Sequence, residues 1–323
     1  MGAEERTQPI KIGALAPTWG PTPDIVGLRD GLVELGYREN EQFVIGVRFT
    51  QGDLTALPAA ARELVQYGVD IIFADYVDAA KAAQMATSRI PIVFAAVDNP
   101  VERGFVQSFA RPGGNITGVT YLEIELLPKR LEVFQQIVPG LKRVLFPYDA
   151  NHAYSLLAAN AYREAARRLG IELVERAVRT EEEAQVTLAQ VRKGEVDGIL
   201  QPSGASFDIP GLILEAASQQ GIPAMFVTGV FWMESGGLAS YGPDFHETGR
   251  QAARLVDKNL KGTKPAEIPV EVNPKVELAI NLKVAKALGL TIAPEVLYRA
   301  DRIIRRPCRI TGKRTGTRFW QRG

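Results

Sequence analysis

Residues 110 to 120 read Ala110-Arg111-Pro112-Gly113-Gly114-Asn115-Ile116-Thr117-Gly118-Val119-Thr120. Pro112 fixes its own φ angle, and Gly113 and Gly114 permit the left-handed backbone angles that a tight reversal needs. Ile116 and Val119, with the neighbouring threonines, then favour a short β-strand. Four strand-and-helix units precede this stretch and several follow it, so we interpret it as the crossing between two similar halves.

Apolar strands alternate with helical segments on both sides of this crossing. Such alternation is typical of parallel sheets covered on both faces, so we expect an α/β chain with two doubly wound parallel-sheet lobes. In the first helix we expect Asp24 to be the N-cap. The expected strands include 11–15, 43–49, 69–74, 90–97, 143–146, 171–178, 198–200, 224–227 and 277–281, and the expected helices include 25–35, 55–67, 125–137, 153–169, 181–192 and 211–219.

Length and charge restrict the class of protein. The chain has 323 residues, 46% of them hydrophobic, and single cores seldom grow beyond about 250 to 300 residues, which favours two domains. Net charge is +1, but from Leu297 onward nine Lys and Arg residues stand against one Asp. The rest of the chain is net negative and offers no general attraction to nucleic acid. We expect residues 305–323 to be a basic, disordered tail.

Several kinds of site find no support in the sequence. Cys308 is the single cysteine, and His152 and His246 are the only histidines, so neither a metal cluster nor a Ser-His-Asp triad is expected. Phosphate-binding glycine motifs are missing from the first strand-to-helix turn, which argues against a nucleotide cofactor. We expect no cofactor, no metal and no catalytic residues.

No apolar run reaches the roughly 18 residues of a membrane span. The segment from Met1 to Gln8 is polar and is not a signal peptide as written. The chain is therefore expected to be cytoplasmic, or to have lost a targeting segment.

Ligands of open parallel sheets bind beyond the carboxyl ends of the strands. There the sequence places aromatic rings, hydroxyls and carboxylates, which suit a pocket for one small organic molecule. Trp19 and Trp232 have an alternative as loop anchors, Asp98 as a helix cap, and Ser203 and Ser206 as plain loop serines. The candidates are Thr18, Trp19, Asp75, Tyr76, Asp98 and Asn99 in the first half, and Tyr148, Asp149, Asn151, Ser203, Ser206, Phe207, Thr228, Phe231 and Trp232 in the second.

Five separate motifs occur in the order found in one protein family. They are residues 31–37 (GLVELGY), 90–96 (IPIVFAA), 109–118 (FARPGGNITG), 236–243 (GGLASYGP) and 280–290 (INLKVAKALGL). With them the chain resembles, from about residue 10 to residue 304, the ABC-transporter substrate-binding proteins of the type that includes tryptophan and tyrosine binders.

The resemblance implies a type I periplasmic-binding-protein fold with three crossings, in which ligand is held between two lobes that close by hinge motion. It implies a first lobe of residues 9–120 and 244–263, and a second of residues 121–241 and 270–304, with crossings near Tyr121, near Gly242 and at 264–269. The hinge residues would be Tyr121, Tyr241, Gly242 and Pro243. It also implies a monomer in the periplasm or another extracytoplasmic place that delivers its ligand to a membrane permease, although without a signal peptide a cytoplasmic location stays open.

The leading hypothesis is a non-catalytic solute receptor for uptake. Trp19, Tyr76, Phe231 and Trp232 would form apolar walls, and Thr18, Ser203, Ser206 and Thr228 would donate hydrogen bonds to an anionic group. Asp98 or Asp75 would pair with an ammonium, so the expected ligand is a small zwitterion such as an aromatic amino acid. The alternatives are a cytoplasmic small-molecule sensor and an α/β enzyme with Asp98 or Asp75 as general base.

Overall fold

The chain divides into two compact units. The computed structural model describes residues 8–18, 20–203, 208–227 and 230–305. The first unit contains the chain up to Leu122 together with Asp244–Lys275, and the second contains Glu123–Pro243 and the described residues from Val276 onward. The chain therefore passes from one unit to the other three times. The predicted basic tail lies outside the described residues from position 306 on.

A six-stranded sheet forms the centre of the first unit, in the order β11-β5-β4-β3-β1-β2. Every neighbouring pair in it is parallel. The continuous apolar runs of these strands fit this arrangement because the sheet is buried on both faces. The strands are β1 Ile10–Ala16, β2 Phe43–Phe49, β3 Ile71–Asp75, β4 Ile92–Ala95, β5 Ile116–Tyr121 and β11 Glu271–Asn273.

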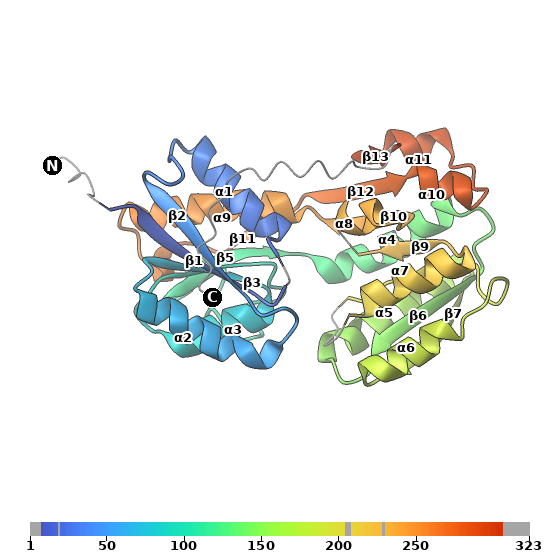
Figure 1. Cartoon of the computed structure of the whole chain (residues 1–323), viewed down its shortest axis with the longest axis horizontal. Helices are drawn as coiled ribbons and strands as arrows, with labels where there is room; N and C mark the ends of the chain where they lie inside the picture. Colours follow the sequence, from blue (N-terminus) through green and yellow to red (C-terminus); the bar gives the residue numbers. More distant parts are fainter. Residues whose placement is uncertain (1–7, 19, 204–207, 228–229, 306–323) are drawn as a thin grey trace. The chain divides into compact units, whose positions relative to one another are not determined.

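Helices cover both faces of this sheet (Figure 1). One face packs against α1 (Pro23–Glu34) and α9 (Phe245–Leu260), and the other against α2 (Leu57–Tyr67) and α3 (Val77–Ala86). Two short 3-10 turns, Leu54–Ala56 and Pro265–Glu267, join these elements.

The second unit contains a seven-stranded sheet in the order β13-β12-β10-β9-β8-β6-β7. Only β12 is antiparallel to its neighbour β10, and the other described pairs are parallel. The strands are β6 Arg143–Asp149, β7 Glu172–Val178, β8 Gly198–Leu200, β9 Ala224–Phe226, β10 Ala239–Pro243, β12 Val276–Asn281 and β13 Arg302–Ile304.

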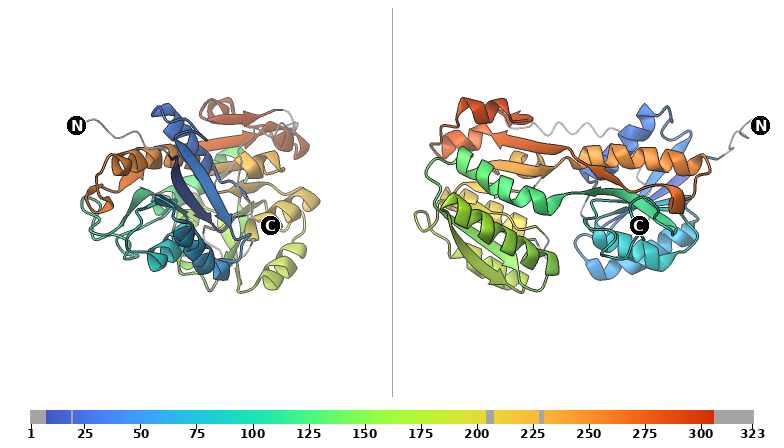
Figure 2. Two further views of the ribbon diagram at one scale, coloured as in Figure 1. Left: turned by 60° about the vertical axis from the view of Figure 1, so that its left-hand side comes forward. Right: turned by 180° about the vertical axis from the view of Figure 1, so that it is seen from behind.

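Helices also cover both faces of the second sheet, as the two further views show (Figure 2). The two faces have separate apolar cores, which confirms the predicted doubly wound α/β fold. On one face lie α4 Glu123–Ile137, α5 Ala153–Leu169, α10 Leu282–Ala287 and α11 Pro294–Tyr298, and on the other lie α6 Glu181–Ala189, α7 Ile209–Gln220 and α8 Val230–Glu234.

The start of α1 differs from the sequence-based expectation. Thr22, and not Asp24, is the N-cap, and its Oγ1 accepts a hydrogen bond from the Ile25 amide at 3.3 Å. The reason is Pro23, whose fixed φ suits the first helical position and whose missing N–H is not needed there. Asp24 therefore lies inside the first turn, where it is completely buried.

The third passage between the units also differs from its expected place. We expected it at 264–269, with residues from 270 onward in the second lobe. The structure instead pairs β11 with β5 in the first sheet, with Glu271 beside Val119, so the passage follows Lys275. The proline-punctuated connection contains a short edge strand that its composition does not indicate.

Helices α1 and α9 pack through glycines. A Cβ atom at Gly27 would lie 2.0 Å from the carbonyl oxygen of His246, and one at Gly249 would lie 2.0 Å from that of Asp24. Both distances are far below van der Waals contact, so the two helix backbones touch directly. This contact fixes the start of α1, and with it the position of Asp24.

We predict that Gly249→Ala lowers the free energy of unfolding by about 1 to 3 kcal/mol, because the added methyl group forces α9 away from α1. Alanine is otherwise favoured over glycine inside helices, so a loss of stability would come from the close contact and not from helix propensity. Urea denaturation measures the change, with Gly114→Ala as control because a Cβ atom there meets nothing within 4 Å. Equal stability of the two variants would contradict the close approach.

Candidate functional site

In each sheet the strand order reverses beside one central strand. The chain places β2 on one side of β1 and then returns to place β3 on the other side. In the second sheet it places β7 on one side of β6 and then β8 on the other. Ligands of open α/β sheets bind outside the carboxyl ends of the strands at such a reversal. The residues that follow β1 and β3, and those that follow β6 and β8, are therefore the candidates.

In the first unit, the reversal brings together Thr22, Asp24 and Asp75. Asp75 ends β3, and its Oδ2 accepts a hydrogen bond from the Thr22 hydroxyl at 2.5 Å. Both aspartates are completely buried. Among the described residues, neither carboxylate oxygen of Asp24 has a hydrogen-bond partner, and nor does Oδ1 of Asp75. The sequence predicted Asp75 as a ligand-binding residue and Asp24 as a helix cap, so it did not predict that the two carboxyl groups form a pair.

Burial controls the ionisation of this pair. It raises the pKa of Asp24 well above its ordinary value, and the neighbouring Asp75 adds to the increase. Burial also raises the pKa of Asp75 to about 7, although the hydrogen bond from Thr22 acts in the opposite direction. Two carboxylates in one buried place cannot both ionise without strong repulsion. The pair therefore holds a proton up to about neutral pH.

Aromatic rings lie beside the acid pair. Tyr76 follows Asp75 directly, and its ring meets Phe245 edge to face, with centroids 6.3 Å apart. Tyr121 packs against the same Phe245 ring at 5.5 Å. The φ angle of Tyr76 is 72°, which is strained for a residue with a side chain, and such strain is concentrated at functional sites. A hinge role for Tyr121 stays a prediction.

Two other candidates of the first unit, Asp98 and Thr18, are hydrogen-bonded within the protein. Both carboxylate oxygens of Asp98 lie 2.8 Å from Nη2 of Arg103. Asn99 is exposed and has a φ of 46°. The Thr18 hydroxyl donates to the carbonyl of Gly20 at 2.9 Å. Trp19 lies outside the described residues.

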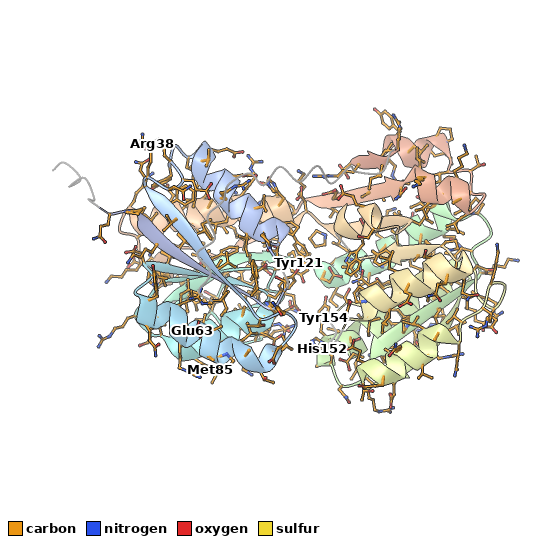
Figure 3. The ribbon with its side chains drawn as sticks, viewed as in Figure 1. Arg38, Glu63, Met85, Tyr121, His152 and Tyr154 are labelled. Atoms are coloured by element: carbon orange, nitrogen blue, oxygen red, sulfur yellow. The ribbon has the colours of Figure 1, made fainter. Side chains whose placement is uncertain are left out.

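In the second unit, the reversal lies between β6 and β8. Tyr148 is buried near the end of β6 and stacks on Phe146, with centroids 5.7 Å apart. Asp149 is the last residue of β6, and its Oδ1 accepts the Asn151 amide at 2.8 Å. His152 and Tyr154 then lie at the start of α5 (Figure 3).

Ser203, which follows β8, belongs to a buried ionic network. Its hydroxyl donates to Oε1 of Glu123 at 2.6 Å, and the same oxygen accepts from Nη2 of Arg130 at 3.0 Å. Arg130 also donates to the hydroxyl of Tyr162 at 2.7 Å and to the carbonyl of Tyr241 at 2.6 Å. Arg130 is completely buried, and burial raises the pKa of Tyr162 to about 12.

This network connects distant parts of the second unit. Glu123 directly follows the first passage between units, and Tyr241 shortly precedes the second passage. The sequence gives no local signal for Arg130, because its partners lie up to 111 positions away. Ser203, predicted to contact ligand, already uses its hydrogen atom within the protein. The hinge roles of Tyr241, Gly242 and Pro243 stay predictions.

For four candidates of the second unit the structure describes no side chain. Ser206, Phe207 and Thr228 lie outside the described residues. Phe231 follows β9 in helix α8, not in a loop, and its side chain is not described. Trp232, in the same helix, stacks on Phe226 with centroids 5.6 Å apart and ring planes at 12°. One face of its ring is therefore covered by the core.

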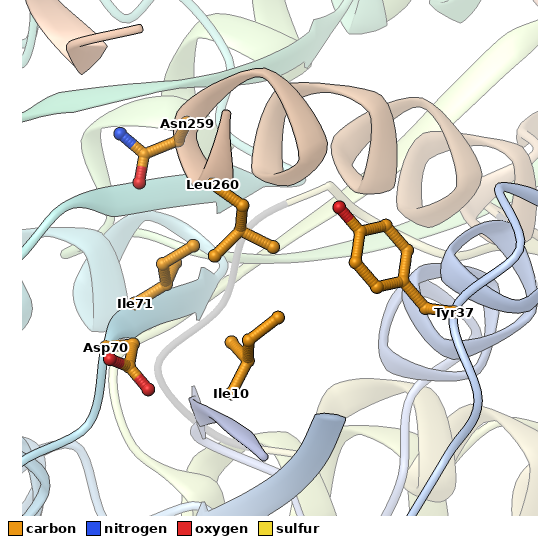
Figure 4. A pocket seen from close by; sticks show the side chains of 6 residues that line it. All are labelled: Ile10, Tyr37, Asp70, Ile71, Asn259 and Leu260. Carbon is orange, nitrogen blue, oxygen red and sulfur yellow. The ribbon is translucent and has the colours of Figure 1, made fainter. Parts of the chain in front are cut away.

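A pocket of about 360 Å³ lies elsewhere in the first unit (Figure 4). Ile10 and Ile71 line it at the amino-terminal ends of β1 and β3. The Tyr37 hydroxyl at its wall donates to Oδ1 of Asp257 at 2.9 Å. Because ligands of this fold class bind at the opposite ends of the strands, we do not assign the ligand site to this pocket.

The described residues contain no metal site and no membrane-spanning helix. No group of His, Cys, Asp and Glu side chains there could hold a metal ion. In the same part of the chain, every helix is too short or too polar to span a bilayer.

We predict that the acid pair makes stability depend on pH. In the folded protein the pKa of Asp75 is about 7, against an ordinary value of 3.8. Its contribution to the free energy of unfolding is therefore fully present below about pH 4 and is lost as the pH rises through about 7. Asp75→Asn should flatten this fall and stabilise the protein at pH 8, by an amount on the order of 2 to 4 kcal/mol. Urea denaturation at a series of pH values tests this. Asp78→Asn, at an exposed position of α3, is the control, and an unchanged slope in Asp75→Asn would contradict the shared proton.

For the ionic network we predict that Arg130→Met lowers the free energy of unfolding by about 3 to 5 kcal/mol, because it leaves the buried Glu123 carboxylate without a counter-charge. The double variant Arg130→Met/Glu123→Leu should recover much of this loss. A double-mutant cycle by chemical denaturation measures the coupling. If the two single effects simply added, the ion pair would not be the source of the loss.

Comparison with known proteins places this geometry in a family. The model of the ABC transporter substrate binding protein family matches residues 20–304. A tyrosine-binding protein of Clostridioides difficile (strain R20291) is 28% identical over 267 residues, which cover 82% of this chain and 76% of that protein.

Two solved structures share both fold and sequence. One is the ABC domain in complex with L-Trp from Streptococcus pneumonia, with a TM-score of 0.77, 27% identity and coverage of 92% of this chain and 100% of that one. The other is a conserved domain protein from Vibrio cholerae, with a TM-score of 0.78, 28% identity and the same coverage. The predicted resemblance is confirmed, and because the family model spans most of its length, the chain belongs to the ABC transporter substrate-binding protein family, a family of binding proteins rather than enzymes.

Proposed function

We propose that this chain binds an aromatic α-amino acid and delivers it to the permease of an ABC transporter. Its relatives include a protein named for tyrosine binding and a domain solved with L-Trp. The observation that carries the proposal is Asp75, a buried carboxyl group at the strand-order reversal, next to Tyr76 and with one oxygen lacking a partner among the described residues. A carboxylate in that position suits an ammonium group, and the adjacent rings suit an aromatic side chain.

The structure favours Asp75 over Asp98 as the ammonium partner. Asp98 already faces the guanidinium of Arg103 at 2.8 Å, so its charge is compensated within the protein. The side chains that interact with Asp75 are the neutral hydroxyl of Thr22 and the carboxyl group of Asp24, and neither supplies a positive charge. An incoming ammonium would supply the missing positive charge.

The raised pKa of Asp75 connects binding to proton release. An ammonium group beside Asp75 favours its ionised form, so the bound state should release the proton that the free protein holds below about pH 7. Affinity should therefore increase as pH rises towards 7 and then level off. A ligand without an ammonium group would show no such dependence.

We further propose that the protein acts as a monomer and takes up its ligand outside the cytoplasm. Both points are supported by membership of the family. That the strand ends of both units serve one ligand, with hinge closure around it, also remains a prediction from the family resemblance.

We predict that Asp75→Asn weakens L-tyrosine binding at least about tenfold at pH 8, because the ammonium loses a charged partner. It should leave the binding of 3-(4-hydroxyphenyl)propanoate, which has no ammonium, within about twofold. Isothermal titration calorimetry measures both affinities, and wild-type titrations in buffers of different ionisation enthalpy at pH 6 count the released protons.

Asp98→Asn is the matched control. A larger loss in Asp98→Asn than in Asp75→Asn would assign the ammonium to Asp98, and no binding of L-tyrosine or L-tryptophan to the wild type would refute the ligand class.

A further inference from the structure

Asp24 is a buried acid without a hydrogen-bond donor. It lies in the first turn of α1 and is completely buried, and no described residue donates a hydrogen bond to either of its carboxylate oxygens. A buried ionised carboxylate is strongly unfavourable unless hydrogen bonds or an opposite charge stabilise it. Protonation removes the charge and turns the carboxyl group into a donor. The lack of donors therefore indicates a neutral carboxylic acid at this position.

Asp75 differs from Asp24 in its hydrogen bonds. Its Oδ2 accepts from the Thr22 hydroxyl at 2.5 Å, and a hydrogen bond to the charged form of an acid favours ionisation. Burial raises the pKa of both carboxyl groups, but their contact with each other lowers the pKa of Asp75 and raises that of Asp24. When the pair has a single proton, that proton therefore belongs to Asp24, and Asp75 is the acceptor.

The charged groups around Asp24 act in the same direction. After burial, the negative charges of Asp75 on β3 and of Asp244 at the start of α9 raise the pKa of Asp24. The positive charge of Lys275 is taken up by Asp244, with 2.8 Å between Nζ and Oδ2. Burial raises the pKa of Tyr76, so this neighbour stays neutral. The amide of Asp24 itself and the dipole of α1 favour the ionised form, but burial outweighs them.

Close packing fixes the position of Asp24. Thr22 caps α1 and Pro23 is its first residue, so the backbone is held on the amino-terminal side. On the other side, a Cβ atom at Gly249 would lie 2.0 Å from the carbonyl oxygen of Asp24, which shows that α9 touches this backbone directly. A donor held in this way orients the carboxylate that accepts from it before the ligand arrives, which lowers the cost of binding.

From these observations we propose that Asp24 is a positioning residue, which keeps its proton when Asp75 ionises and donates a hydrogen bond to the Asp75 carboxylate. The proposal deepens the proposed function, on which it rests for the identity of the ligand. With Asp24 neutral, the pair presents one negative charge, which matches the single positive charge of an ammonium group. Two ionised carboxylates would leave one buried charge without compensation after the ligand had bound.

The test compares two neutral replacements of Asp24, with L-tyrosine affinity measured over a series of pH values by isothermal titration calorimetry. Asp24→Asn keeps a donor of similar size, so we expect affinity within about threefold of the wild type and a pH profile with the same midpoint. Asp24→Leu fills the space without a donor. Its midpoint should rise by about one to two pH units, and its affinity at pH 7 should fall at least about tenfold. Melting temperatures check that both variants fold.

The controls separate this role from a general effect of charge. Asp30→Asn makes the same change at a partly exposed position of α1 and should bind like the wild type. If Asp24 were ionised, Asp24→Asn would remove a negative charge, so its affinity would fall at least about tenfold and its midpoint would move to lower pH. That result would overturn the proposal. Equal affinities and midpoints in Asp24→Asn and Asp24→Leu would overturn it as well.

A measurement without ligand distinguishes this proposal from the proposed function. If the wild type bound neither L-tyrosine nor L-tryptophan, the ligand class would fail, and carbon NMR of the aspartate carboxyl groups would decide the role of Asp24. The signals are assigned from their loss in Asp24→Asn and in Asp75→Asn. An Asp24 signal that stays at the position of a protonated acid while Asp75 titrates would support the proposal. An Asp24 signal that titrates together with Asp75, or at lower pH, would overturn it.

Discussion

Each sheet is covered by helices on both faces, and this constraint decides where polar chemistry can occur. Most of the buried side chains within the strands are apolar, such as Phe73 and Phe94 in the first unit and Phe146 in the second. Polar groups are stabilised at the strand ends, where helix N-termini and loops supply donors. At the reversal of strand order in each sheet, the loops that follow two neighbouring strands diverge from each other. Asp75 and Ser203 both lie at such positions, one in each unit.

The two units stabilise buried charge in opposite ways. In the second unit, Arg130 and Glu123 neutralise each other, and hydrogen bonds from Ser203 and to Tyr162 complete the network. In the first unit, Asp24 and Asp75 have no basic partner in hydrogen-bond range among the described residues, and a shared proton is the remaining way to reduce repulsion. The first arrangement is rigid and structural. The acid pair of the first unit instead has a proton that it can exchange for a positively charged group, which suits the ammonium of the proposed ligand.

Patterns of apolar residues predict the fold well because each element buries its own local stripe. The strand at 43–49 and the helix at 153–169 have the predicted bounds in the structure. Asp75, Tyr148 and Ser203 could be predicted as strand-end residues for the same reason. Arg130 could not, since apart from Glu123, which is 7 positions away, its partners are 32 to 111 positions away. Strand β11 is too short, and too near Pro269 and Pro274, for its pairing with β5 to be evident.

The contact between α1 and α9 has a consequence for biosynthesis. The core beneath α1 contains Ala252, Leu255 and Val256 of α9 together with Ile268, and β5 finds its outer neighbour in β11. A ribosome therefore releases all of the second sheet up to β10 before the first unit has its complete set of residues. The amino-terminal 122 residues emerge with the apolar surface of β1 and α1 still uncovered, and such surfaces promote aggregation during folding. The first unit can therefore complete its folding only after helix α9 has been synthesised, and α9 follows most of the second unit in the sequence.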